Sequence, residues 1–321
     1  RFRPEVMTSK ISNKTGDKID LDTTYHSIAN NRIYGHELSA YLEDNIKMND
    51  RLRLNLGLHF SLFHVQKQSY FSLQPRISAR YQLTDDITLK ASYTKMSQYV
   101  HLLSSMPIAM PTDLWVPVTK EIKPMQSHQY SLGGYYTGIT GWEFSVEGYY
   151  KDMRNVLEYK DGVSFFGSST GWENKVEMGK GRSAGIEFMA QKTLGRTTGW
   201  LSYTLSKSDR QFAKGGINNG ERFPYKYDRR HNINLTVNHK FNERIDIGAS
   251  WVFYTGGTST IPEEKTAIIR PGNGANNGYT PGYEDYYNPA YNNSPNIGES
   301  NYVEHRNNYR LPASHRLNIG I

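Results

Sequence analysis

The sequence predicts an all-β protein, an antiparallel up-and-down β-barrel that crosses a membrane, and two observations lead to this prediction. Long stretches alternate residue by residue between apolar and polar side chains, and short turns alternate along the chain with long connections. In RLRLNLGLHFSL, residues 51–62, the leucines fall on one side, whereas Arg51 and Arg53 fall on the other. Period two is typical of a β-strand, because successive Cβ atoms point to opposite faces of a sheet.

The composition fits a folded protein with little conventional core. Of 321 residues 37% are hydrophobic, the mean hydropathy is −0.69, and 13% are aromatic. Disordered chains lack aromatic residues, so we expect the chain to fold. No run approaches the roughly 18 apolar residues of a transmembrane helix. A hydrophilic average is compatible with a membrane β-barrel, since its strands show lipid only alternate side chains.

Net charge and chain ends add further limits. The charge of +7 comes from lysines and arginines spread along strands and loops, so no nucleic-acid partner is predicted. The absence of cysteine fits an oxidising compartment, although many cytosolic proteins also lack it. The sequence begins at Arg1 without a signal peptide, and alternation continues to Ile321. We therefore expect a part of a longer polypeptide.

The predicted strands form five hairpins and a final strand. Their ranges are 34–44 with 51–62, 71–81 with 87–96, 126–136 with 142–151, 182–192 with 199–208, 231–241 with 245–254, and 309–321. Most connectors within a pair hold the Asn, Asp, Gly and Thr of tight turns. The connections between pairs are mostly long, namely 96–125, 152–181, 209–230 and 255–308. This pattern predicts short periplasmic turns at one end of a barrel and long extracellular loops at the other.

The apolar face of the predicted strands often ends in an aromatic side chain, as in interfacial girdles. These residues are Tyr81, Tyr93, Trp142, Phe241, Trp251 and Phe253. A soluble antiparallel sheet with one wet face also alternates. Such a sheet needs a covering layer, and no amphipathic helical segment is present to supply one. We therefore expect the apolar face to contact outer-membrane lipid.

Several sequence blocks in the region of residues 35–254 resemble a known family. They include YLEDNIKMNDRLRLNLGLHFS, YFSLQPRISARYQLTDDITLKASYTK, PTDLWVPVT, FSVEGYYKDMRNVLEY, GKGRSAGIEFMAQKTLGRTTGWLSYTLSKSDR and FPYKYDRRHNINL. They resemble the C-terminal barrel of TonB-dependent outer-membrane receptors, particularly those of Bacteroidetes-type bacteria. The resemblance implies a barrel of about 22 strands filled by a plug. Residues 1–321 then form a single partial barrel domain, without a recognisable plug, TonB box or completed final strand.

The resemblance also implies a function, a location and partners. It implies import across the outer membrane by plug rearrangement driven by TonB, which would bind an N-terminal region absent from this sequence. The cargo can be an iron chelate, cobalamin, a glycan or a peptide. No cofactor and no enzymatic activity are expected. A surface lipoprotein or other outer-membrane subunits are further candidate partners, and the alternative function is a scaffold barrel without active transport.

Charged residues on the polar face have two interpretations. They are Arg51, Arg53, Arg76, Arg80, Lys90, Glu143, Glu147 and Glu187. In an open lumen they would select anionic solutes. In a plugged barrel they would pair with the plug and hold it. Both interpretations keep charge away from lipid, where a midplane Arg or Lys costs about 2–4 kcal/mol.

The predicted extracellular loops hold candidate contacts for substrate or partner. Trp115 in PTDLWVPVT can stack on a ligand or pack within its loop. A Tyr-rich loop offers large contact areas at low entropic cost, or is simply solvated. Its tyrosines are Tyr279, Tyr283, Tyr286, Tyr287 and Tyr291.

Other polar motifs predict neither catalysis nor metal binding. Asp228 and His231 in YDRRH lack a nucleophile at any recognisable spacing, so we interpret them as a polar cluster at a strand end. Asp17, Asp20 and Asp22 resemble a calcium loop only superficially, since its glycine and distal Glu are missing.

Overall fold

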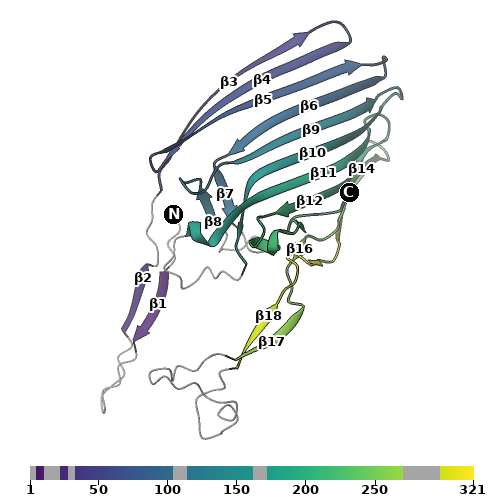
Figure 1. The fold of residues 1–321 in the computed structure, drawn as a ribbon. Helices are drawn as coiled ribbons and strands as arrows, with labels where there is room; N and C mark the ends of the chain where they lie inside the picture. Colours follow the sequence, from purple (N-terminus) through teal and green to yellow (C-terminus); the bar gives the residue numbers. More distant parts are fainter. Residues whose placement is uncertain (1–4, 11–21, 28–32, 104–113, 162–171, 270–296) are drawn as a thin grey trace, which may run out of the picture.

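The computed structural model describes residues 5–10, 22–27, 33–103, 114–161, 172–269 and 297–321. Most of its strands form one curved antiparallel sheet, which we call the wall (Figure 1). The order across the wall is β20-β15-β14-β12-β11-β10-β9-β6-β5-β4-β3, so nearly every strand pairs with its nearest wall neighbours in sequence. This is the up-and-down arrangement that the sequence predicts.

The wall strands are long enough to cross a membrane obliquely, since about 9–11 residues suffice for a tilted strand. Their bounds are β3 (Gly35–Lys47), β4 (Leu52–Val65), β5 (Gln68–Gln82), β6 (Ile87–Gln98), β9 (Met125–Tyr136), β10 (Trp142–Tyr159), β11 (Val176–Lys192), β12 (Thr197–Gln211), β14 (His231–Lys240), β15 (Asp246–Tyr254) and β20 (Ser314–Gly320).

The strand register separates the two faces predicted from the alternation. Leu56 on β4 lies opposite Ile77 on β5, and Ile77 lies opposite Tyr93 on β6. Asn55 lies in the adjacent row, opposite Ser78. The apolar side chains are exposed, with 40% of Leu56 and 45% of Ile77 accessible. Among the described residues, no second layer covers this apolar face.

Short turns close the wall at one end, and their side chains support them. Asn49 Oδ1 accepts a hydrogen bond from the backbone N–H of Leu52 at 2.7 Å. Asn242 Oδ1 does the same for Ile245 at 3.0 Å. Such bonds let an Asn side chain satisfy backbone donors within the turn, which explains the preference for this residue.

The opposite end of the wall holds smaller elements, which we call the cap (Figure 1). They are β7 (Val100–Leu103), β8 (Leu114–Pro117), η1 (Trp172–Lys175), η2 (Ile217–Gly220), β13 (Phe223–Pro224), β16 (Thr258–Ser259) and β19 (Tyr309–Arg310). Buried apolar clusters lie here, around Leu103 with Val116 and around Phe63 with Val118. Conventional core is therefore concentrated in the cap.

Two further hairpins are formed by β1 (Glu5–Lys10) with β2 (Asp22–Ser27) and by β17 (Glu264–Ile269) with β18 (Ile297–Tyr302). The second hairpin belongs to the long connection 255–308 predicted from the sequence.

The structure changes the predicted boundaries at the cap end. Strands β10 and β11 extend well beyond the predicted limits, and the connection between β4 and β5 shrinks to Gln66 and Lys67. Their φ angles of 48° and 66° are left-handed, as a tight two-residue hairpin requires.

The prediction of one continuous strand from residue 309 to the end is wrong. Tyr309 and Arg310 pair with β16, and β20 then pairs with β15. Pro312 lies between the two segments and has no N–H to donate, so the chain changes partner there.

Candidate functional site

A row of charged residues crosses the polar face of the wall near the turn end, and we call it the charged row. In register order it comprises Lys47, Arg53, Arg80, Lys90, Gly133, Glu147 and Glu187. Positive charges occupy β3 to β6 and negative charges occupy β10 and β11. The structure thus brings together five of the predicted residues: Arg53, Arg80, Lys90, Glu147 and Glu187.

Tyr135 connects the positive and negative halves of the charged row. Its hydroxyl donates to Glu147 Oε2 at 3.0 Å, and Lys90 Nζ lies 3.7 Å from its ring centroid. Gly133 separates Lys90 from Glu147 in register, and a Cβ built on it would lie 3.3 Å from Glu147 Cβ. Sequence reasoning missed Tyr135. The available signal was the glycine inside strand 126–136, because a glycine within a strand often marks a point where another group approaches the backbone closely.

A cavity of about 350 Å³ lies over this region of the polar face. Its lining includes Arg53, Arg80, Lys90, Tyr135 and Glu147, along with serine and asparagine side chains. None of the ion pairs of the described residues involves Arg53 or Arg80. Like charges that face each other across strands are destabilising, so this arrangement favours an anionic partner.

The other predicted charges of the polar face lie outside the charged row. Arg76 is adjacent to Gly57 in register, and Glu143 precedes Glu147 by four residues on β10. Arg51 is exposed and precedes the first residue of β4, so it belongs to a turn.

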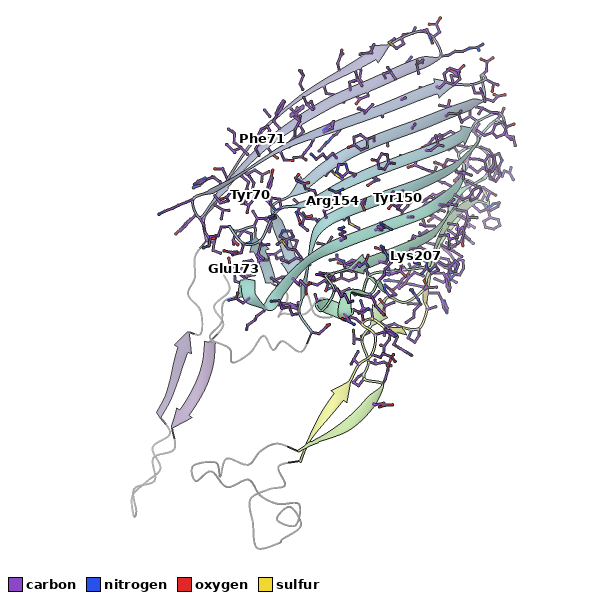
Figure 2. All side chains as sticks on the ribbon, viewed as in Figure 1. Tyr70, Phe71, Tyr150, Arg154, Glu173 and Lys207 are labelled. Carbon is purple, nitrogen blue, oxygen red and sulfur yellow. The ribbon has the colours of Figure 1, made fainter. Side chains whose placement is uncertain are left out.

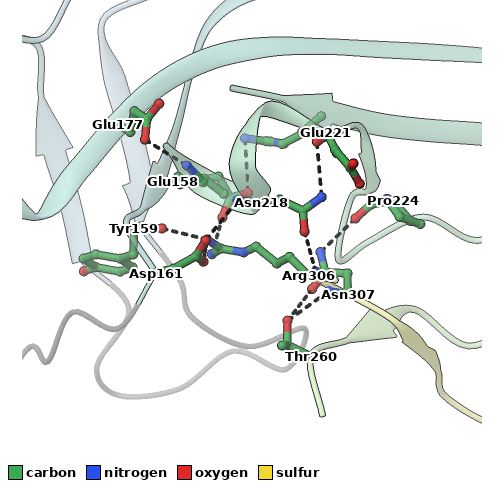
Figure 3. Close-up of polar contacts among 12 residues, drawn as sticks. Glu158, Tyr159, Asp161, Glu177, Asn218, Glu221, Pro224, Thr260, Arg306 and Asn307 are labelled. Atoms are coloured by element: carbon green, nitrogen blue, oxygen red, sulfur yellow. Dashed lines mark hydrogen bonds and ion pairs between the residues drawn. The ribbon is translucent and has the colours of Figure 1, made fainter. Parts of the chain in front are cut away.

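Arg306 fixes the root of the long connection 255–308 to the end of β10 (Figure 3). Its Nη2 lies 3.2 Å from Glu158 Oε2, and its Nη1 donates to Tyr159 O at 2.8 Å and to Asp161 Oδ1 at 3.0 Å. Arg210 pairs with the second oxygen of Glu158 at 3.4 Å. The Glu158 side chain is only 7% exposed, and these two arginines compensate its charge.

Asn218 and Glu177 hold the same region together from the β11–β12 side (Figure 3). Asn218 Oδ1 accepts the backbone N–H of Arg306 at 2.7 Å, and its own N–H donates to Asp161 Oδ2 at 2.9 Å. Glu177 Oε2 accepts the N–H of Ile217 at 3.1 Å. Asn218 has φ 51°, a left-handed conformation that Asn tolerates better than most residues.

Asp228 forms a second anchor for this connection. Its buried carboxylate accepts the Ser208 N–H at 2.6 Å and pairs with Arg310 Nη2 at 2.6 Å. Arg230 lies farther away, at 3.4 Å. His231 instead contacts Tyr203, with 2.9 Å between Nδ1 and Oη. Asp228 and His231 therefore do not form an acid–base pair.

The hairpin of β7 and β8 carries Trp115 and a buried histidine. Trp115 is 64% exposed, so the structure leaves it available for contact. His101 is 4% exposed, and its Nε2 has no hydrogen-bond partner in the described part of the chain. Burial lowers the pKa of His101 to about 4, since it disfavours the charged imidazolium.

The predicted contacts Tyr279, Tyr283, Tyr286, Tyr287 and Tyr291 lie outside the described residues. Within the described ranges, no group of three acidic or histidine side chains is arranged to hold a metal ion.

Taken together, an antiparallel wall with an exposed apolar face, a charged polar face, short turns and a polar cap defines a class, the membrane β-barrel. The family described as TonB dependent receptor-like, beta-barrel matches residues 8–320, and the chain belongs to this family. β-Barrels of this family sit in the outer membrane. No helix in the described residues is long and apolar enough to span a membrane.

Solved receptors share this fold at low sequence identity. The pyoverdine receptor FpvA of Pseudomonas aeruginosa PAO1, solved bound to pyoverdine, is 13% identical with a TM-score of 0.55, covering 94% of this chain and 37% of that one. The siderophore receptor PirA from Acinetobacter baumannii is 16% identical with a TM-score of 0.52, covering 89% and 39%.

The FrpB iron transporter from Neisseria meningitidis (F3-3 variant) is 15% identical with a TM-score of 0.52, covering 71% of this chain and 34% of that one. This chain thus spans about a third of the length of these receptors. No curated protein matches the sequence.

Proposed function

We propose that this chain forms part of an outer-membrane receptor that imports a solute with energy supplied through TonB. Membership of the TonB dependent receptor-like barrel family is the observation that carries the proposal. The extracellular cap captures the solute, a plug that fills the barrel rearranges, and the solute passes to the periplasm. The proposed import involves no step that makes or breaks a covalent bond, so we propose a receptor and not an enzyme. The Bacteroidetes-type affiliation is part of this proposal and is supported by the sequence blocks.

The charged residues of the polar face line the lumen in this proposal. In support, Arg53 and Arg80 lack an acidic partner among the described residues, whereas their neighbour Lys90 contacts Tyr135. In the resting receptor they contact the plug, and in the transporting state they face the solute. An anionic cargo suits both cations, and an iron chelate is the first candidate because FpvA and PirA are described as pyoverdine and siderophore receptors.

The cap supplies the outer binding surface. Trp115 is exposed there, and the connection that holds Tyr279, Tyr283, Tyr286, Tyr287 and Tyr291 starts from a root fixed by Arg306. A fixed root presents such a connection from a constant position on the barrel. Deletion of part of 272–296 should therefore impair uptake or partner binding while the barrel still folds. Unchanged uptake would remove this segment from the recognition surface.

Uptake of a labelled anionic iron chelate by cells tests the proposal. The paired change Arg53→Gln and Arg80→Gln in the full-length receptor should reduce uptake about tenfold, equivalent to about 1.4 kcal/mol. Arg244→Gln removes one positive charge from an exposed turn and should leave uptake unchanged. Equal uptake by the paired variant and by the Arg244 variant would contradict a role for the charged row.

The alternative is a scaffold barrel that holds partner subunits without active transport. Its specific support is the rigid attachment of the cap by Arg306 and Arg310, which suits a docking platform. Removal of TonB separates the two functions. If removal of TonB abolishes uptake while the complexes on the cell surface remain, the receptor is supported. If these complexes form without solute and no uptake depends on TonB, the scaffold is supported.

A further inference from the structure

The apolar face of the wall carries a groove across β9 to β12, on the side opposite the charged row. The groove has a volume of about 830 Å³ and is lined mainly by apolar atoms. Tyr130 and Tyr150 lie at one side, and Ile186 and Leu205 lie at the other. Figure 2 labels Tyr150 on β10 and Lys207 on β12, which are separated by β11.

Small residues create the floor of the groove. Gly148 lies between Leu132 and Ile186 in register, and Ala184 lies between Tyr150 and Lys207. A Cβ built on Gly148 would meet only one backbone atom, at 4.0 Å, so space above this glycine is open. A flexible hydrocarbon chain can fill such a shallow apolar channel.

The groove lies where the outer face changes from apolar to charged. On β10, Tyr150 is followed on the same face by Asp152, and on β9, Tyr130 is adjacent to His128. Trp142 lies eight residues before Tyr150, or about 26 Å along the strand. For a strand tilted by about 40°, this length is about 20 Å along the membrane normal, which is most of the apolar band of about 25 Å between the two aromatic girdles of membrane barrels. The groove therefore starts at one membrane interface.

Two cations border the groove at this interface. Lys207 is exposed and forms no ion pair in the described part of the chain. Arg230 is half-buried and lies 3.4 Å from Asp228, whose carboxylate is already bound by Arg310 at 2.6 Å. A guanidinium has five N–H donors, so Arg230 retains donors for another acceptor.

The acidic residues near these two cations already have arginine partners. Asp152 lies 3.9 Å from Arg182 and 3.8 Å from Arg154, and Asp209 pairs with Arg222. The local charge left uncompensated is therefore positive. A phosphate group at the membrane interface complements it, since Lys and Arg both bind phosphate through charge-assisted hydrogen bonds.

We propose that this groove binds a phosphate-bearing lipid of the outer leaflet, with an acyl chain over Gly148 and Ala184 and the phosphate on Lys207 and Arg230. The proposal rests on the proposed membrane orientation, in which the cap faces outward. Both parts of the ligand match the groove. The hydrocarbon lies against apolar side chains, and the phosphate lies at the same level of the wall as Lys207 and Arg230.

Native mass spectrometry of the full-length receptor in mild detergent tests this proposal. The probes are diphosphorylated lipid A and the same lipid after phosphate removal. The wild-type receptor should bind the phosphorylated probe at least about tenfold more tightly. Lys207→Ala together with Arg230→Ala should abolish this preference. Equal binding of both probes to the wild type, or an unchanged preference in the double variant, would overturn the proposal.

Two further variants sharpen the measurement. Lys192→Ala removes a lysine from the same outer face at the turn end, where its Nζ lies 5.6 Å from the Trp142 ring, and should retain the preference. Gly148→Leu fills the floor and should weaken binding of both probes. Normal binding by Gly148→Leu would contradict the acyl-chain position. The assay contains no cargo and no TonB, so failure of the transport proposal would not alter its outcome.

Discussion

The wall and the cap place apolar and charged side chains in opposite ways. In the wall, Leu56 and Ile77 are exposed on one face while Arg53 and Arg80 share the other. In the cap, Leu103 and Val116 are buried together as in a water-soluble domain. The same hydrophobic effect explains both arrangements if lipid surrounds the wall and water surrounds the cap.

The two regions also differ in how their charges are balanced. At the cap end of the wall, buried Glu158 on β10 and buried Asp228 are each paired with arginines. In the charged row, Arg53, Arg80 and Lys90 remain without acidic partners in the described residues, whereas Lys47 pairs with Asp50 at 2.6 Å. These buried charges at the cap end are therefore balanced by arginines, whereas the polar face of the wall has unused capacity for a partner.

The largest effect is expected from placing charge on the apolar face of the wall. Leu56→Arg would put a cation in the lipid-facing centre of β4, at a cost of about 2–4 kcal/mol, and should block membrane assembly. Asn55→Arg, one residue away on the polar face, should be tolerated. The measurement is the fraction of heat-modifiable folded protein in outer membranes. Equal tolerance of both changes would overturn the assignment of the faces.

The next largest effect is expected in the cap. Arg306→Met removes one of two partners of buried Glu158 and should destabilise the loop root by about 3 kcal/mol. Protease cleavage within 255–308 should rise strongly while the wall stays protected. Arg316→Met, an exposed change on β20, should leave cleavage unchanged. Identical protease patterns for the two variants would show that Arg306 does not hold the root.

A pH change should loosen the cap before the wall. The pKa of His101 is lowered to about 4 in the fold, so unfolded chains bind more protons as the pH falls below about 6.5. The contribution of His101 to stability is thus intact above pH 6.5 and lost progressively towards pH 4. Between pH 7 and 5 the β7–β8 hairpin should lose about 2 kcal/mol of protection.

Hydrogen exchange of the β7 amides, corrected for intrinsic rates, measures this loss. His101→Gln cannot titrate and should show protection that no longer depends on pH in this range. A pH response of equal size in His101→Gln would assign the effect to other groups.

The smallest effect is expected at the junction of the charged row. Tyr135→Phe removes the hydroxyl that donates to Glu147 and should lower the free energy of unfolding by about 1 kcal/mol. Tyr149→Phe is the matched control on the same face, since no hydrogen bond of the Tyr149 hydroxyl is present in the described structure. Urea unfolding of both variants compares them, and equal losses would contradict a specific role for the Tyr135 hydroxyl.

Sequence pattern predicted the wall well because each strand carries its own two-residue period. The adjacent rows of Leu56 and Asn55, and the pairing of Arg53 with Arg80, follow from this local alternation and are confirmed by the register. The cap was not predictable in this way. Its contacts join distant residues, such as Arg306 with Glu158, whose sequences carry no local signal.

The contact of Tyr135 with Lys90 was missed for a similar reason, since it depends on the pairing of β6 with β9 across the long connection 96–125. The break at Pro312 was visible in the sequence, but the continuing alternation on both sides obscured the change of partner strand.

Single-cysteine labelling tests the central claim most directly, because the sequence contains no cysteine that would interfere. A spin label on Leu132→Cys, a 66% exposed position of the apolar face, should be relaxed by lipid-dissolved oxygen and shielded from an aqueous nickel complex. A label on the adjacent Ser131→Cys should show the reverse. Similar aqueous accessibility at both positions would contradict a wall with one face in lipid and the other in a polar lumen.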